Sequence, residues 1–148
     1  MRFLALIIML CFASFYGMAQ AEPVYTGVFN DLAVSGYDTV AYFAQNKAVE
    51  GEKSISVDWQ GAEWRFSSER NKQTFLNNPE KYAPQYGGYC AYALGAKDDL
   101  VSSDPQSWTI VNGKLYLNYD KDIRDRWIEN KDDFIAEADK NWVKYKDK

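Results

Sequence analysis

Two stretches of the chain alternate apolar and polar residues with a period of two, and a short turn interrupts each of them. In the first, residues 54–59 and 62–67 flank Gln60-Gly61. A hairpin with this loop places Ile55 opposite Phe66 and gathers the apolar residues of both strands on one face. The period therefore predicts a β-hairpin over about residues 54–67.

The second stretch contains the stronger turn signal. Asn112-Gly113 is the preferred pair for a type I′ loop, because both positions of that turn need a positive φ. The resulting register places Ile110 opposite Leu115. A second hairpin is therefore predicted over about residues 108–119.

Helical signals lie between and after the hairpins. Ser67 or Ser68 suits the N-cap of a helix that ends before Pro79, and residues 79–82 predict one further turn. Apolar residues spaced four apart predict two C-terminal helices, divided around residues 130–133. Residues 95–105 are polar and are predicted to be irregular. Two hairpins, short helices between them and two helices after them give an α+β fold.

The first 21 residues have the pattern of a secretory leader. Arg2 precedes an apolar stretch over residues 3–15, and Ala19-Gln20-Ala21 is a small-x-small cleavage site. We therefore expect a signal peptide over residues 1–21, a periplasmic or secreted location, and one domain over the remaining 148 − 21 = 127 residues, 22–148. The apolar stretch is too short to span a bilayer well, so no stable membrane insertion is expected after its removal.

Sulfur and imidazole are nearly absent from the expected mature chain. The sequence has no His, and all three Met and one of the two Cys lie within the first 21 residues. The net charge of −4 becomes −5 once Arg2 is removed, and there is no basic run, so nucleic acid is not an expected partner. The chain has no P-loop, no dinucleotide-binding glycine pattern and no G-x-S-x-G motif, so we expect no enzyme activity.

Cys90 is the one cysteine outside the predicted leader. It could be a metal ligand, with copper or haem as the cofactor, an oxidisable thiol, or the link of a disulfide-bonded homodimer. The alternative is a small buried residue in an aromatic core. No Lys, Arg or His lies within six residues of Cys90, so no neighbour in the sequence favours the thiolate.

Aromatic residues give a second group of candidates. Tyr86, Tyr89 and Tyr92 recur at intervals of three and, together with Tyr37 and Asp38, are candidates for lining a small-ligand pocket. Core packing of the rings is the alternative. Asp38 also precedes an apolar run, a position in which Asp commonly caps a helix. An exposed aromatic patch would instead serve a protein partner.

Three strings in the first half of the chain resemble the YHS domain family. They are GYDTVAYF at 36–43, WRFSS at 64–68 and FLNNPEKY at 75–82, and they follow one another in the family's order. The resemblance covers about residues 34–82 and leaves residues 83–148 as a C-terminal extension. It implies a non-catalytic binding module with an accessory role in metal handling, chiefly of copper.

The resemblance also indicates where a metal would be bound. Metal-type members carry cysteines in their first segment and a Cys-x-x-x-Cys pair after the hairpin, and the corresponding residues here are Ala41, Ser67 and Asn71. These residues do not supply the thiolates that Cu(I) and structural zinc sites use. The family's usual metal ligands are therefore expected to be lost, which leaves a small ligand or a protein partner as the expected binding partner.

Overall fold

The structure is a computed structural model that describes residues 24–146, and the predicted signal peptide lies outside these residues. Its helices are α1 (Thr39–Ala44), α2 (Glu69–Asn77), α3 (Pro79–Tyr82), α4 (Ala91–Lys97), α5 (Lys121–Glu129) and α6 (Lys131–Lys146). Its strands are β1 (Glu52–Trp59), β2 (Ala62–Phe66), β3 (Asp104–Val111) and β4 (Lys114–Asn118). Two short 3₁₀ turns are η1 (Val34–Gly36) and η2 (Gln85–Gly88). Two antiparallel hairpins with helices between and after them confirm the α+β prediction.

The first hairpin, β1–β2, follows the predicted register only near its turn. The pairs from Ser56 to Trp59 are those expected, but Phe66 pairs with Glu52 and not with Ile55. A register shift between Glu52 and Ser56 causes the difference, because β1 advances four residues there while β2 advances one. Period-two alternation alone does not reveal such a bulge.

The second hairpin, β3–β4, confirms the turn prediction. Asn112 and Gly113 have φ values of 51° and 72°, as a type I′ turn requires, and Ile110 pairs with Leu115. β3 begins at Asp104, earlier than predicted, and its register shifts before Trp108. The prediction of an irregular stretch over residues 95–105 was therefore wrong at both ends, because a helix, α4, continues to Lys97 and β3 begins at Asp104.

The helix α4 was missing from the prediction. Gly95, a poor helix former, lies within it and weakens the local signal. At Gly95 the backbones of α4 and α6 lie close together, because a Cβ at this position would lie 2.4 Å from the carbonyl oxygen of Phe134. Tertiary packing thus stabilises a helix that local propensity does not indicate.

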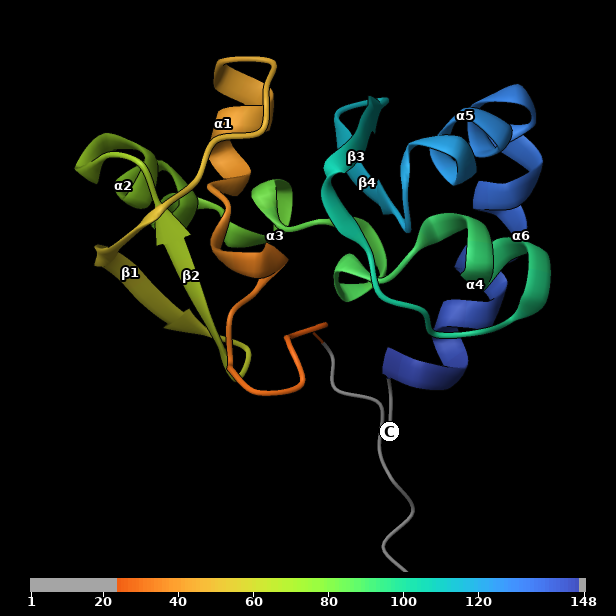
Figure 1. Ribbon diagram of the computed structural model, residues 1–148, viewed down its shortest axis with the longest axis horizontal. Coiled ribbons are helices and arrows are strands. Elements are labelled where there is room, and N and C mark those ends of the chain that lie inside the picture. The colour runs from red at the N-terminus through yellow and green to blue at the C-terminus, as the bar shows by residue number, and fades with distance from the viewer. Residues whose placement is uncertain (1–23, 147–148) are drawn as a thin grey trace, which may run out of the picture.

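The β3–β4 hairpin is shared by two hydrophobic cores. Leu115 and Leu117 pack into the first core, with Trp64 and Phe75. Tyr116, between them on β4, points to the opposite face and packs into the second core, which also includes residues of α4, α5 and α6. In Figure 1 the hairpin accordingly lies between the elements α1–β2 and the helices α4–α6.

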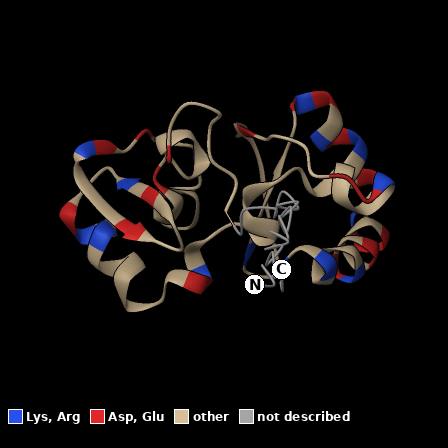
Figure 2. Ribbon diagram, turned by 90° about the horizontal axis from the view of Figure 1, so that it is seen from below, with Lys and Arg blue, Asp and Glu red and all other residues tan. Residues whose placement is uncertain are grey.

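The surface carries both signs of charge. Figure 2 shows Lys, Arg, Asp and Glu residues interspersed over both halves of the molecule. None of the helices within residues 24–146 is long and apolar enough to cross a membrane.

We predict that Leu117→Ala lowers the free energy of unfolding by about 2–5 kcal/mol, because the side chain is 1 % exposed and its removal leaves a cavity in the first core. Urea unfolding followed by tryptophan fluorescence measures the change. Val143→Ala, at a residue that is 50 % exposed, is the control and should cost less than about 1 kcal/mol. Equal losses from the two substitutions would contradict the packing described for β4.

Candidate ligand-binding site

Asp38 is the N-cap of α1, and it is fully buried. Its Oδ1 accepts hydrogen bonds from the backbone N–H groups of Val40 and Ala41, at 3.0 and 3.2 Å. Its Oδ2 accepts from the backbone N–H and the hydroxyl of Ser67, at 2.8 and 2.6 Å, and from Asn71 Nδ2 at 2.8 Å. This Asp38 network therefore joins the start of α1 to the end of β2 and the first turn of α2.

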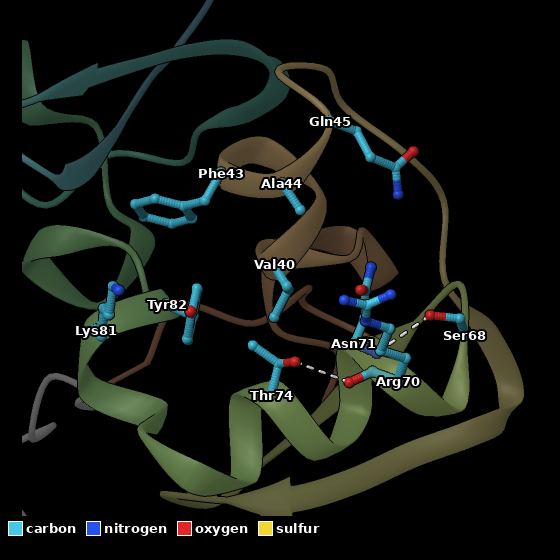
Figure 3. A pocket seen from close by; sticks show the side chains of 10 residues that line it. All are labelled: Val40, Phe43, Ala44, Gln45, Ser68, Arg70, Asn71, Thr74, Lys81 and Tyr82. Atoms are coloured by element: carbon cyan, nitrogen blue, oxygen red, sulfur yellow. Dashed lines mark hydrogen bonds between the residues drawn. The ribbon is translucent and has the colours of Figure 1, made fainter.

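A cavity of about 710 Å³ lies between α1, α2 and α3 (Figure 3). We call it the α1–α2–α3 cavity. Val40 and Phe43 of α1 and Tyr82 of α3 form its apolar wall. The rings of Phe43 and Tyr82 pack edge to face with centroids 5.3 Å apart, and Lys81 Nζ lies 5.3 Å from the centre of the Tyr82 ring. The volume falls within the range of small-molecule sites, roughly 300–1,000 Å³.

Polar side chains of α2 and its cap form another wall of this cavity. Ser68 Oγ accepts a hydrogen bond from the Asn71 N–H at 3.1 Å, and the Thr74 hydroxyl donates to the Arg70 carbonyl oxygen at 2.9 Å. In Figure 3 the Arg70 side chain extends from α2 toward α1. Asn71 lines the cavity and also donates to Asp38, so the network fixes one wall of the cavity in place.

Cys90 lies in a different part of the molecule, at the N-cap of α4. It is 1 % exposed, and its thiol donates to Asn118 Oδ1 at 3.6 Å. Burial raises the pKa of the Cys90 thiol above its ordinary value. Cys90 and Tyr92 line a small cavity of about 190 Å³, below the usual size of a small-molecule site. This environment is that of a buried, protonated core cysteine.

The other candidate tyrosines near Cys90 have packing roles. Tyr86 lines a separate cavity of about 600 Å³, and its hydroxyl donates to Asp139 Oδ1 at 2.8 Å. Burial and this hydrogen bond raise the pKa of the Tyr86 phenol. The Tyr89 ring packs against Trp142, with centroids 6.3 Å apart. Both contacts hold η2 against α6.

Tyr37 is separated from these residues. Its hydroxyl donates to Glu50 Oε1 at 3.5 Å and accepts from Gln106 Nε2 at 3.2 Å. The neighbouring Asp38 is fully engaged in its own network. The six residues proposed from the sequence thus lie at several places: Cys90 and Tyr92 line one cavity, whereas Tyr86 lines another.

The comparison with protein families bears on the segment that forms the Asp38 network and the cavity. The sequence profile of the YHS domain matches residues 40–86. Residues 40–86 are a YHS domain. The match spans about a third of the chain, confirms the resemblance, and contains every residue that lines the α1–α2–α3 cavity. No curated protein and no solved structure matches the chain.

YHS domains are associated with metal handling, chiefly of copper. A copper site would need side chains that bind a soft metal. The residues that the resemblance places at the family's cysteine positions are Ala41, Ser67 and Asn71, and each of them donates a hydrogen bond to Asp38. A methyl group, a hydroxyl and an amide do not fit a soft metal. Within residues 24–146 no three His, Cys, Asp or Glu side chains come together to hold a metal ion. The positions at which the resemblance places metal ligands therefore donate hydrogen bonds to the Asp38 carboxylate.

The residues of the cavity were not identified from the sequence. Arg70 and Thr74 are spaced four apart and so lie on one face of α2, and Lys81 follows in the NPEKY string. That spacing is a usable signal, but exposed polar residues on a helix are normally only solvated. The folding of α3 back onto α1 is what brings Lys81 to the same cavity.

We predict that Asp38→Ala lowers the free energy of unfolding by about 3–5 kcal/mol, because five donors lose their acceptor in a buried site. Urea titration followed by circular dichroism measures the loss. The control is Asp58→Ala, at an exposed position of β1, which should change stability by less than about 0.5 kcal/mol. A loss below about 1 kcal/mol for Asp38→Ala would show that the network is not a major stabilising contact.

We also predict that Cys90 reacts with a disulfide reagent at pH 8 at least about a hundredfold more slowly in the folded protein than in urea. Its raised pKa leaves less thiolate at this pH than an ordinary cysteine has, and burial blocks the reagent. The absorbance of the released thiol gives both rates. Similar rates in the two states would favour a reactive or dimer-forming thiol.

Proposed function

We propose that this protein is an exported, non-catalytic binding module that holds a small ligand in the α1–α2–α3 cavity. The observation that carries the proposal is an open cavity of about 710 Å³, built entirely from residues of the YHS domain. It combines an apolar wall with several convergent polar groups, as ligand sites commonly do. The secretory pattern of the first 21 residues supports export.

The proposal does not depend on a metal held by thiolates. The Asp38 network uses Ser67 and Asn71 as donors, and Cys90 lies elsewhere with a raised pKa. In this domain α1, α2 and α3 are arranged around an open space. A ligand in that space would contact side chains and not a metal ion.

A protein-partner function is the second candidate, and one observation favours it. Val28 and Phe29 are adjacent, and they are 89 % and 98 % exposed. Exposed neighbouring apolar residues are typical of contact surfaces. Binding of a partner through them would be sensitive to Phe29→Ser, whereas binding of a small ligand in the cavity would not.

A library of small molecules, screened by ligand-observed NMR against the chain lacking residues 1–21, tests the proposal. The matched variants are Thr74→Trp, which fills the cavity from α2, and Gln73→Trp, which adds the same side chain at an exposed position of the same helix. We expect compounds that bind the unmodified protein and Gln73→Trp but lose at least about tenfold in affinity for Thr74→Trp.

Two results would overturn the proposal. One is a screen with no binder. The other is a set of binders whose affinity is the same for Thr74→Trp and for the unmodified protein. Circular dichroism spectra of both tryptophan variants show whether each is folded, and amide shifts of Val40 and Tyr82 on titration show whether a binder occupies the cavity.

A further inference from the structure

The α1–α2–α3 cavity is positively charged although the chain carries a net charge of −4. Among the residues that line it, Arg70 and Lys81 are the only charged ones. Each has a Glu beside it in the sequence, but Glu69 is not part of the lining, and Glu80 lines the separate 600 Å³ cavity. The two cations therefore face the same space without a carboxylate among the lining residues.

Neither cation is neutralised by another described residue. Within residues 24–146, Arg70 and Lys81 take part in no salt bridge, whereas Arg65 pairs with Glu63 at 2.6 Å. The Lys81 ammonium has the face of Tyr82 beside it, which leaves its N–H groups free to donate. The guanidinium of Arg70 likewise keeps its donors for a ligand.

The remaining walls indicate the rest of the ligand. Val40, Phe43 and Tyr82 present apolar surface, while the hydroxyls of Ser68 and Thr74 lie on the α2 side. A simple inorganic ion would leave the apolar wall without a contact. The wall suits a ligand whose charged group lies near the cations and whose body is apolar.

We infer that the ligand of this cavity is a small organic anion, with a carboxylate or phosphate group toward Arg70 and Lys81 and an apolar body against Val40, Phe43 and Tyr82. The inference rests on the function proposed above. A guanidinium binds carboxylate and phosphate alike through two parallel hydrogen bonds, so both head groups share this chemistry. Because both cations are exposed, the attraction should weaken as salt is added.

Three ring compounds of similar shape separate charge from shape: benzoate, phenyl phosphate and the neutral benzamide. Each is titrated into the chain lacking residues 1–21 while amide shifts of α1, α2 and α3 are recorded. We expect at least one anion to bind at least about tenfold more tightly than benzamide at low salt, and to lose this advantage as sodium chloride is raised to 0.5 M. Preference for one anion over the other identifies the head group.

Arg70→Gln and Lys81→Gln test the assignment of the two cations. Both residues are exposed, so folding should be retained. We expect Arg70→Gln to raise the dissociation constant of the preferred anion about tenfold or more, and Lys81→Gln to raise it several-fold. The control is Lys72→Gln, which removes a cation from α2 that does not line the cavity and should change the constant less than twofold.

The outcomes separate this inference from the proposed function. If benzamide, or any neutral compound from the library, binds in the cavity as tightly as the anions, the inference is overturned and the proposed function stands. The same holds if Arg70→Gln and Lys72→Gln have equal effects. If neither the ring compounds nor the library contains a binder sensitive to Thr74→Trp, both are overturned.

Discussion

The structure depends first on one buried carboxylate. Asp38 accepts hydrogen bonds from the start of α1, from Ser67 directly after β2 and from the first turn of α2, and no other described side chain joins these three segments through hydrogen bonds. Since all its partners are donors, the position requires a side chain with two acceptor oxygens. Asn71 extends the constraint to the α1–α2–α3 cavity, because it both donates to Asp38 and lines the cavity wall.

This domain differs from the metal-binding members that the resemblance describes. At the positions expected for metal ligands it has residues that donate hydrogen bonds to a carboxylate. In a metal centre, thiolates converge on a cation; here Ser67 and Asn71 converge as donors on an anion. The Asp38 network fixes Ser67, which follows β2, against α1 and α2 through hydrogen bonds alone. The adjacent cavity is lined by two cations and no carboxylate, which is why we propose an anion as its ligand.

The sequence predicts what local patterns determine. Period-two alternation locates the first hairpin, turn residues locate the second, and capping residues locate α1 and α2, because these signals act over a few residues. Local patterns did not predict the bulge in β1 or the helix α4, since long-range packing decides both. Gly95 weakens the local helix signal, and its lack of a side chain lets α6 approach α4 closely. Local patterns do not reveal the cavity for the same reason, because Arg70 and Lys81 line the same space only once α3 folds back. The burial of Cys90 was one of the alternatives that the sequence left open.

The most direct test of this account is the stability of the protein with and without metal. The free energy of unfolding in urea would be measured after exhaustive treatment with EDTA and a Cu(I) chelator, and again after one equivalent of Zn²⁺ or of Cu⁺ is added. Because a metal that binds only the folded state must stabilise it, the account predicts the same unfolding midpoint in every sample. A midpoint that falls on chelation, or rises with one equivalent of either metal, would contradict the account, in which the positions expected for metal ligands donate hydrogen bonds to Asp38.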